Sequence, residues 1–482
     1  FFVEQRTLPM QWDTSGLIAG IVCKEQRLEP IAISATPIQS SKKLFKYFGI
    51  KRYSKVALRS SYLHPKILLL SFLKSLIDFV YFILNGRDFT DFINNYTVGN
   101  VHLGDLIFDK FIRSENRFIQ PKNHLYAFFK EILRAQYSAR QQLNLFSRYN
   151  PKLVIVTSRA YSSVGGIMSR IALRKGIPTW VNSGIYRYKL DSYKQAFKGD
   201  YHYALTDLYD EFPENWLEIV DNYLEARFKG DVEQHDVKFA FAIENKSSIK
   251  HLVDWIGSKK RNLPVVIIFA HAFSDANNFD GELLFDSYYD WLKETLEIAK
   301  KRSDCLWVVK PHPSAELYHE NIDIYKQLIE EIGADNFYLL DEKVNSKSIL
   351  DLATAIITCR GTVTLEATAL RIPCITAARP SFGEFSINHR AHNLEQYRAL
   401  LGSVDELSMP DSTQVELAKR LVYKYQIVDQ GLEDKNTARR RGLTKVIPTL
   451  KPKANSDRKG IEKFFEEYFY DLNQNLLHKN LE

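Results

Sequence analysis

Short apolar segments alternate with longer segments of helical periodicity along most of the chain. In the first half the apolar segments are residues 17–22, 31–34 and 153–157. In the second half they are residues 265–269, 306–310, 337–340, 355–358 and 374–377. Strands that alternate with helices favour parallel sheets with helices on both faces. We therefore predict an α/β protein with two doubly wound, Rossmann-like sheets.

The clearest single unit is residues 151–181, PKLVIVTSRAYSSVGGIMSRIALRKGIPTWV. It predicts a strand, a loop, a helix, a Gly-Ile-Pro turn and a second strand. This succession is one βαβ crossover, which joins neighbouring parallel strands.

With 482 residues the chain is too long for a single hydrophobic core, so we expect two domains with a ligand site in the cleft between them. Residues 210–248 are polar and helical, and we place the boundary near residue 236. The predicted domains are residues 1–236 and 237–445. Residues 446–482 form a helical tail with an amphipathic stripe from Ile461 to Leu476.

The longest apolar segment is residues 66–84, KILLLSFLKSLIDFVYFIL. Lys74 and Asp78 interrupt it near the middle, so we do not expect a helix that spans a membrane. The helical spacing of its apolar residues favours a buried helix. A helix on a membrane surface is the alternative left open.

The formal net charge is +7, which suits anionic ligands, nucleotides or a phospholipid surface. We found no run of Arg and Lys long enough to predict a nucleic-acid partner. The four cysteines, Cys23, Cys305, Cys359 and Cys374, lie far apart and predict neither a zinc site nor a disulfide framework. We see no signal-peptide pattern, and we expect a cytoplasmic protein, with a peripheral contact at the inner face of the inner membrane left open.

Three loops after strands of the second half are unusually polar. The first, AHAFSDANNFDGE, contains His271, Ser274, Asp275 and Asn277, the second is PHPS, and the third is CRGTVTLEA. Because the carboxyl ends of parallel strands meet at one edge of a sheet, we expect these loops to converge there.

The third loop has the composition of a phosphate site. Gly361, Thr362 and Thr364 open a helix whose free backbone N–H groups can hold phosphate, and Arg360 can pair with a phosphate oxygen. Glu366 lies in the first turn, where its carboxylate can accept hydrogen bonds from ribose hydroxyls. The competing interpretation is a helix cap made by Thr362 or Thr364.

Lys310 and His312 stand at the end of the second of these strands, and Pro313 directs the imidazole toward the cleft. A histidine there can donate a hydrogen bond to a phosphate oxygen without a metal. The chain has no Asp-x-Asp triplet, so we expect protein donors to stabilise the leaving group, with no metal and no cofactor besides a nucleotide-sugar co-substrate. Phosphate-loop, dinucleotide-fingerprint and nucleophile-elbow motifs are also missing, which disfavours kinases, dehydrogenases and serine hydrolases.

These residues carry a resemblance. The segments VVIIFAHAFSDANNFDGELLFDSYYDWLKETL, WVVKPHPS and ITCRGTVTLEATALRIPCITA resemble the bacterial capsule and lipopolysaccharide surface-carbohydrate biosynthesis family, which are glycosyltransferases of the GT-B fold. VHLGDLIFDKFIR resembles a segment of the acceptor half of such proteins. The resemblance implies that the second domain binds a nucleotide sugar, that the first binds the growing glycan, and that the C-terminal tail packs back on the first domain.

The His-Pro pair with the small hydroxyl turn also resembles bacterial sialyltransferases and Kdo transferases. By that resemblance His312 contacts a donor phosphate, Thr362 and Thr364 assist it, and Glu366 holds the nucleotide. His271, Ser274, Lys310, Arg360 and Gly361 complete the predicted donor site. Gly-Thr-Val-Thr departs from the paired Ser/Thr of those transferases, so CMP-Kdo and other CMP, UDP, GDP or dTDP sugars all stay open as donors.

A transferase that inverts configuration needs a base within reach of the acceptor hydroxyl. The candidates are Asp105 and Asp109 in the first domain and Asp275 in the second, with a plain helix N-cap as the competing role for Asp105. Ser158 and Arg159 end a first-domain strand and are candidates for acceptor binding.

The sequence predicts a metal-independent glycosyltransferase that extends a capsule or lipopolysaccharide O-antigen glycan. Three alternatives stay open: a polyol-phosphate transferase of teichoic type, a hydrolysing UDP-sugar 2-epimerase, and a non-catalytic protein of polysaccharide assembly.

Overall fold

The structure is a computed structural model, and it describes residues 2–5, 29–34, 50–56, 64–113, 117–182, 187–190, 192–198, 212–232, 240–241, 246–259, 262–279, 283–313, 315–318, 320–341, 344–380, 382–383 and 385–428. The predicted strand at residues 17–22, the boundary near residue 236 and the tail at residues 446–482 lie outside these ranges.

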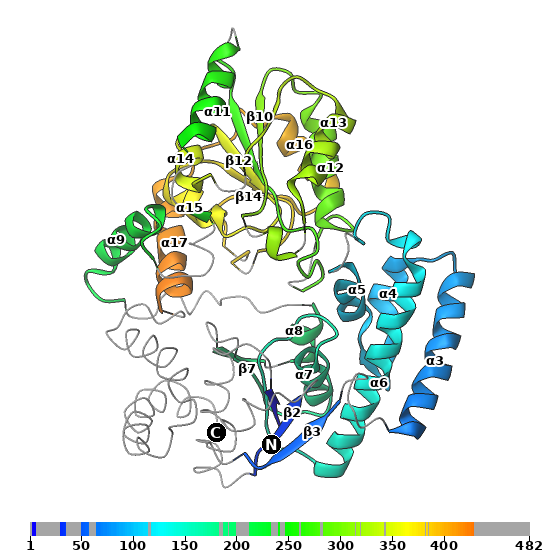
Figure 1. Ribbon diagram of the computed structural model, residues 1–482. Helices are drawn as coiled ribbons and strands as arrows, with labels where there is room; N and C mark the ends of the chain where they lie inside the picture. Colours follow the sequence, from blue (N-terminus) through cyan, green and yellow to red (C-terminus); the bar gives the residue numbers. More distant parts are fainter. Residues whose placement is uncertain are drawn as a thin grey trace.

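The first domain contains a six-stranded sheet in the order β3-β2-β1-β6-β7-β8 (Figure 1). Its strands are β1 (Phe2–Gln5), β2 (Ile31–Ser34), β3 (Arg52–Lys55), β6 (Val154–Val156), β7 (Thr179–Asn182) and β8 (Arg187–Leu190). All neighbours pair in parallel except β7 and β8. The predicted βαβ crossover is confirmed as β6, α7 (Val164–Arg174) and β7.

A helical group covers one side of the first domain. It comprises α3 (Pro65–Leu84), α4 (Phe89–Asn95), the short strands β4 (Thr97–Val98) and β5 (Val101–His102), α5 (Gly104–Ile112), the 3-10 turn η1 (Pro121–Asn123) and α6 (Leu125–Tyr149). Its core is aromatic, because Phe128 of α6 lies within 4.8 to 5.1 Å, centroid to centroid, of four other Phe rings from α3, α4 and α5. The short helix α8 (Tyr193–Lys198) follows β8.

The second domain contains a six-stranded, all-parallel sheet in the order β11-β10-β9-β12-β13-β14. Its strands are β9 (Val265–Phe269), β10 (Leu306–Lys310), β11 (Phe337–Leu339), β12 (Ala355–Thr358), β13 (Cys374–Thr376) and β14 (His389–Arg390). Five of them confirm the predicted apolar segments. Its helices are α11 (Lys246–Ser258), α12 (Tyr288–Ala299), η3 (Ala315–Tyr318), α13 (Ile322–Ile332), α14 (Ser346–Leu350), α15 (Val363–Ala369), α16 (Leu394–Gly402), α17 (Ser412–Leu421) and the π-helix η4 (Val422–Val428).

Both sheets have the same connectivity. Taken in chain order, the strands of each sheet occupy the positions 3-2-1-4-5-6, which is the order of the dinucleotide-binding Rossmann sheet. The strand order reverses between β1 and β6 in the first sheet and between β9 and β12 in the second. The predicted fold class of two Rossmann-like α/β domains is confirmed, and Figure 1 shows the two domains one above the other.

Helix α9 (Trp216–Phe228) packs on the second domain, although it precedes the predicted boundary. Val220 and Leu224 share an apolar cluster with Leu365 and Ala418, and Lys419 forms an ion pair with Asp221 at 2.6 Å. The boundary near residue 236 stays a prediction.

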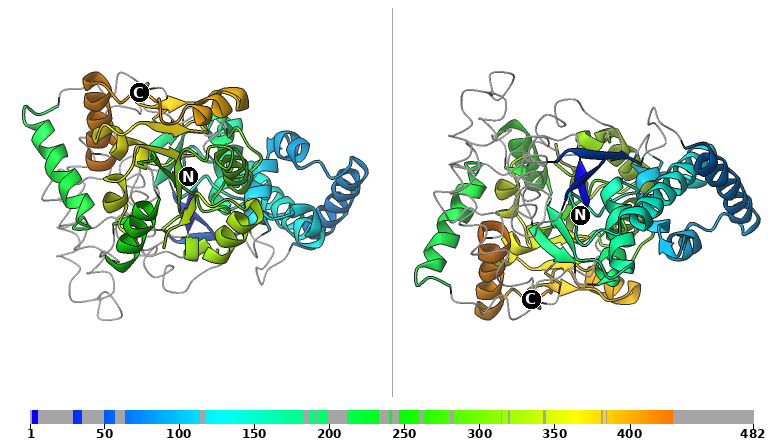
Figure 2. Two further views of the ribbon diagram at one scale, coloured as in Figure 1. Left: turned by 90° about the horizontal axis from the view of Figure 1, so that it is seen from above. Right: turned by 90° about the horizontal axis from the view of Figure 1, so that it is seen from below.

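Helix α3 is largely exposed, so the buried-helix interpretation of residues 66–84 is wrong. Only 17% of its most apolar window is buried, and it lies at the edge of the molecule in Figures 1 and 2. Among the described residues it is the one helix long and apolar enough to cross a membrane. Its exposed apolar side chains, which we call the α3 apolar face, are Leu69, Leu70, Phe72, Leu73, Leu76, Ile77, Val80, Tyr81 and Leu84.

Candidate functional site

The three polar loops of the second domain meet at the point where its strand order reverses. The backbone N–H of Arg360, after β12, donates to Nε2 of His271, after β9, at 3.1 Å. The His271 ring stacks on Tyr288 with 4.5 Å between centroids, and the His312 ring, after β10, lies 6.4 Å away. In open α/β sheets this reversal point is the usual ligand crevice.

Both histidines are neutral at pH 7. Burial lowers the pKa of His271 well below its usual value, and His312 and Arg360 lower it further. Burial lowers the pKa of His312 to about 4, although the Asp275 carboxylate acts in the opposite direction. A neutral imidazole has one N–H donor and one acceptor nitrogen. Because Nε2 of His271 accepts from Arg360, its proton is assigned to Nδ1.

The Gly361 to Thr364 turn is closely packed and has no side-chain cap. A Cβ at Gly361 would lie 2.7 Å from Oγ1 of Thr358, so only glycine fits there. Thr362 is the N-cap residue of α15, and its hydroxyl makes no capping hydrogen bond. The buried Thr364 hydroxyl donates to the Gly361 carbonyl at 2.9 Å. Thr362 therefore occupies the N-cap position that the competing interpretation expected, although its side chain does not cap the helix, and Thr364 lies inside α15. Phosphate binding by the two threonines stays a prediction.

Glu366 lies inside the second domain in a buried ion pair. Nε of Arg227, from α9, donates to its Oε1 at 2.7 Å, and both side chains are 3% exposed. Arg227 was missed from the sequence because it lies 139 residues away and no local pattern connects the two. Contact between Glu366 and a nucleotide stays a prediction.

Ser274 and Lys310 hold loops in place. The backbone and the hydroxyl of Ser274 both donate to Oε1 of Glu320, at 2.9 and 2.8 Å. Burial raises the pKa of Glu320 to about 7 despite these hydrogen bonds. The Lys310 ammonium group donates to the carbonyl of Val344 at 2.7 Å. Glu320 was also missed, and its position a few residues beyond the PHPS loop was its only signal.

Asp275 reaches across to the first domain. The Tyr161 hydroxyl, in the loop after β6, donates to Oδ1 of Asp275 at 2.9 Å, and the Arg113 guanidinium lies 3.5 Å from the same oxygen. Arg113 lies between the rings of Tyr161 and Tyr318, 4.6 Å from each centroid. Burial, then Asp275, raises the pKa of both tyrosines, so their hydroxyls stay protonated. The Asp275 side chain is 45% exposed, so it is a held but accessible carboxylate.

The backbone is strained where the two domains meet. Tyr161 has φ 59° and Ala276 has φ 42°, in the left-handed region that costs an ordinary residue about 1 kcal/mol or more. Such strain persists where the surroundings enforce a geometry, and it often marks functional sites.

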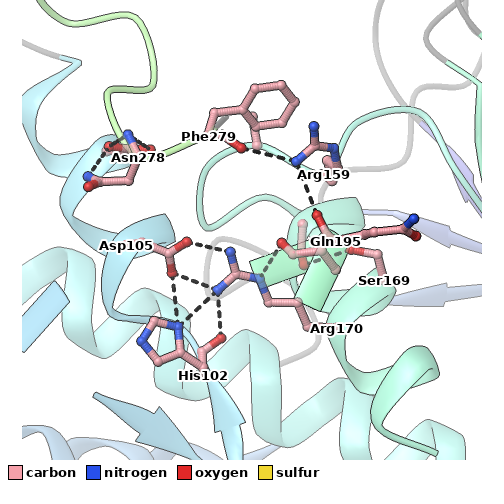
Figure 3. Close-up of polar contacts among 12 residues, drawn as sticks. His102, Asp105, Arg159, Ser169, Arg170, Gln195, Asn278 and Phe279 are labelled. Atoms are coloured by element: carbon pink, nitrogen blue, oxygen red, sulfur yellow. Dashed lines mark hydrogen bonds and ion pairs between the residues drawn. The ribbon is translucent and has the colours of Figure 1, made fainter. Parts of the chain in front are cut away.

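Residues 275–279, which we call the interdomain loop, contact the first domain at two further points (Figure 3). The carboxylate of Asp109 accepts from the backbone N–H of Asn278 at 3.2 Å and from its side-chain amide at 2.7 Å. Arg159 donates to the Phe279 carbonyl at 3.0 Å and covers the Phe279 ring. Burial, then Asp105, raises the pKa of Asp109 to about 8, against the effect of the Asn278 hydrogen bonds.

Asp105 lies in a buried ionic cluster rather than at a helix cap, which corrects the N-cap interpretation, because the N-cap residue of α5 is Leu103. The guanidinium of Arg170 donates to both carboxylate oxygens, at 2.6 and 2.5 Å, and Nδ1 of His102 lies 3.2 Å away (Figure 3). Burial alone would raise the pKa of Asp105, but Arg170 outweighs it and the pKa is lowered. This geometry makes Asp105 a poor proton acceptor.

In the first domain the side chain of Glu4 occupies the N-terminus of helix α7. Oε2 of the buried Glu4 accepts from the backbone and hydroxyl of Thr157, at 2.7 and 2.8 Å, and Oε1 accepts from the N–H of Gly165 at the start of α7, at 3.0 Å. A Cβ at Gly165 would lie 2.1 Å from Oε2 of Glu4. An internal carboxylate thus occupies the position where a phosphate binds in many Rossmann domains.

The predicted acceptor residues lie beside this helix. Ser158 is half-buried, and its hydroxyl accepts from the N–H of Ala160 at 3.1 Å. Arg159 is buried and contacts the interdomain loop. Acceptor binding by these two residues stays a prediction.

One cavity of about 1220 Å³ lies between the helical group of the first domain and helices α12 and α13 of the second. Its lining includes Arg87, Asp105, Phe118, Asn278 and Lys293. Of the predicted site residues, Asp105 alone is part of the lining. The cavity therefore borders the interdomain loop at Asn278, and neither His271 nor His312 is part of its lining.

A buried amide in the interdomain loop has unsatisfied hydrogen-bonding atoms. The Asn277 side chain is 0% exposed, and neither its oxygen nor its nitrogen has a hydrogen-bond partner among the described residues. Such groups are rare and call for water or a ligand. The described part of the chain holds no group of three or more His, Cys, Asp or Glu side chains that could bind a metal, and metal independence stays a prediction.

Comparison with models of protein families finds no match, and comparison with curated proteins finds none either. Among solved structures, the chain is similar to UDP-GlcNAc 2-epimerase from Neisseria meningitidis bound to UDP-GlcNAc, at 11% identity and a TM-score of 0.28, over 90% of this chain and 99% of that one. It is also similar to KpsC, the beta Kdo 2,4 transferase of Thermosulfurimonas dismutans, at 11% identity and a TM-score of 0.35, over 58% and 85%. At similarities this low, the function has to come from the chain's own residues.

Proposed function

We propose that this protein is a glycosyltransferase that moves a sugar from a nucleotide-activated donor to a growing bacterial surface glycan. The observation that supports it best is the accessible carboxylate of Asp275. It lies in the loop after β9 and is held by Tyr161 and Arg113 of the opposite domain, while its charge acts on the neutral His312. A carboxylate and a neutral imidazole at the junction of two Rossmann-like domains suit proton removal on one side and phosphate binding on the other.

The second domain suits the nucleotide-sugar donor better than the first domain does. Its strand-reversal point carries His312, Arg360 and the uncapped turn at Gly361 and Thr362. In the first domain the corresponding helix N-terminus is filled by Glu4, which leaves no room for a second anion.

In the proposed reaction, Asp275 accepts the proton of the acceptor hydroxyl as that oxygen attacks the sugar carbon of the donor. The bond from that carbon to the nucleotide phosphate breaks, and the phosphate carries away the electron pair. The N–H of His312 and the guanidinium of Arg360 stabilise the negative charge that develops on the leaving phosphate. His271 is a positioning residue, since it holds the Arg360 backbone.

The first test is a thermal-shift screen of the full chain with CMP, UDP, GDP, dTDP and CDP-linked ligands in the presence of a chelator. One nucleotide should raise Tm, and His312→Ala should weaken its affinity by about tenfold, the worth of one charge-assisted hydrogen bond. His392→Ala is the matched control, because His392 is exposed. The proposal fails if no nucleotide binds.

Turnover then distinguishes transfer from its alternatives. A transferase releases nucleotide from its sugar donor only when a glycan acceptor is present. Release of CMP from CDP-glycerol or CDP-ribitol alone would indicate a polyol-phosphate transferase, and turnover of a UDP-sugar without acceptor would indicate an epimerase. Binding without any turnover would indicate an assembly protein.

A further inference from the structure

Helix α3 differs from an ordinary surface helix, because it buries Phe82 but exposes most of its other large apolar side chains. Its polar residues Ser71 and Ser75 are buried, and Oδ2 of Asp78 accepts from the Tyr96 hydroxyl at 2.9 Å and from the Gln136 amide at 3.0 Å. The α3 apolar face points outward, with exposed fractions from 43% for Phe72 to 78% for Leu84. Surface helices in water normally bury their apolar side and expose their polar side.

This apolar surface is concentrated on one element. Of the fourteen large apolar side chains that are exposed among the described residues, nine belong to α3 and a tenth, Tyr126, to the adjoining helix α6. Scattered exposed apolar residues are normal, but a continuous patch of this kind marks a binding surface.

Polar contacts hold α3 on the first domain. Besides the Asp78 contacts, the backbone N–H of His64, just before the helix, donates to the Tyr137 hydroxyl of α6 at 3.1 Å. A spanning helix would have to carry Asp78 into hydrocarbon, which is costly. The helix can therefore lie along a bilayer surface while its inner side stays on α6.

The charges and aromatic residues around the face match an anionic lipid surface. Lys66 is exposed in the first turn of α3 and Lys130 of α6 is exposed beside Tyr126, while Lys74 is ion-paired with Asp78 at 2.9 Å. Tyrosine and lysine side chains place a polar tip among lipid head groups above an apolar body. We propose that the α3 apolar face docks on the surface of a membrane that contains anionic phospholipid, with α3 parallel to that surface.

A second copy of the chain fits this face less well. In a symmetric dimer the same patch meets itself, so Lys66 and Lys130 of one copy would meet the same apolar and basic face rather than a surface of opposite charge. A bilayer with anionic head groups supplies opposite charge instead.

The position of the cavity beside α3 also bears on how a glycan acceptor reaches the protein, an inference that rests on the proposed transfer reaction. The turn that ends α3, at Asn85 and Arg87, and Asn278 of the interdomain loop line the same cavity. A protein docked through α3 would hold this cavity near the membrane, where a glycan on a lipid anchor could enter it.

The test is flotation of the full chain with vesicles of phosphatidylcholine alone or with phosphatidylglycerol, without nucleotide or acceptor. The wild type should float with the anionic vesicles. Leu73→Glu/Ile77→Glu should weaken binding by about tenfold or more for each side chain, and Lys66→Gln/Lys130→Gln by about fivefold for each lysine on anionic vesicles only. Leu217→Glu/Val253→Glu is the matched control, because both residues are exposed apolar side chains, at 44% and 45%, on α9 and α11.

Failure of the wild type to bind anionic vesicles would overturn the proposal, as would equal binding by the α3 variant and its control. Light scattering in the absence of lipid tests the alternative that a second copy of the chain binds this face. A wild-type dimer that Leu73→Glu/Ile77→Glu converts to a monomer would assign the face to a second copy. Because these measurements need neither donor nor turnover, they can fail while the proposed reaction stands.

Discussion

Tyr161 of the first domain donates a hydrogen bond to Asp275 of the second domain, with 2.9 Å between the phenolic oxygen and Oδ1. Tyr161 makes this contact from a left-handed backbone conformation, φ 59°, and its hydroxyl stays protonated because burial raises its pKa. The contact orients an accessible carboxylate at the junction of the two domains. It is the geometric basis for giving Asp275 the role of base.

Asp275→Asn should lower kcat by about 10² to 10⁴, the usual contribution of a general base, with little change in nucleotide affinity. Tyr161→Phe should lower kcat by about tenfold, because the carboxylate stays but loses one orienting hydrogen bond. Asp335→Asn, an exposed carboxylate before β11, serves as control. Wild-type kcat in Asp275→Asn would remove it from the mechanism.

Glu366→Ala should lower the free energy of unfolding by about 3 to 5 kcal/mol, because it leaves the buried Arg227 guanidinium without its carboxylate. Arg227→Met/Glu366→Leu should recover much of that loss, since it removes both charges together. Chemical denaturation measures both effects. Glu225→Ala, which breaks an exposed ion pair with Lys229 on the same helix, should cause no measurable change.

The same double variant also tests the predicted nucleotide contact. If Glu366 binds ribose, the stable double variant should lose nucleotide affinity. Unchanged affinity would show that Glu366 acts only through its ion pair with Arg227.

The burial of Asp109 beside Asp105 should make stability depend on pH. The pKa of Asp109 is raised to about 8 in the folded protein, so between its ordinary value and about 8 the folded state binds more protons than the unfolded state. Stability should therefore fall as pH rises through that range, by up to about 1.4 kcal/mol per pH unit. Asp109→Asn keeps an acceptor for Asn278 and should flatten this dependence in Tm measured against pH.

Glu320 has a raised pKa of about 7 and contributes in the same direction. Glu320→Gln should remove the contribution of Glu320 to the pH dependence of stability. An unaltered pH profile in Asp109→Asn would show that this carboxyl is ionised in the folded protein.

Glu4→Gln should lower the free energy of unfolding by about 1 to 3 kcal/mol, because an amide cannot accept all three hydrogen bonds from Thr157 and Gly165. Nucleotide affinity should not change, since the donor is proposed to bind the second domain. Calorimetry on wild type and Glu4→Gln measures both quantities. A large loss of affinity would move the donor to the first domain.

Local patterns were sufficient for most of the second domain, because strands buried on both faces form continuous apolar runs and parallel strands end at one edge. Four strands of the two sheets, β1, β3, β8 and β14, were missed. RYSK of β3 is polar and β14 has only two residues, so these two depend on pairing with a neighbouring strand rather than on their own composition. Helix α3 was correctly predicted as a helix, but its apolar side was expected to be buried and is exposed. Periodicity shows that apolar residues share one side of a helix, but not whether another element covers that side.

The sequence by itself determined the two α/β domains, the three polar loops and the conjunction of His271, His312 and Arg360, because these follow from periodicity and strand direction. Only the tertiary structure decided which charges are already paired. Asp105 is bound by Arg170 and Glu366 by Arg227, while Asp275 stays accessible. Pairing depends on distances between residues far apart in the chain, and burial then sets the proton affinity of each group. No spacing along the sequence encodes either quantity.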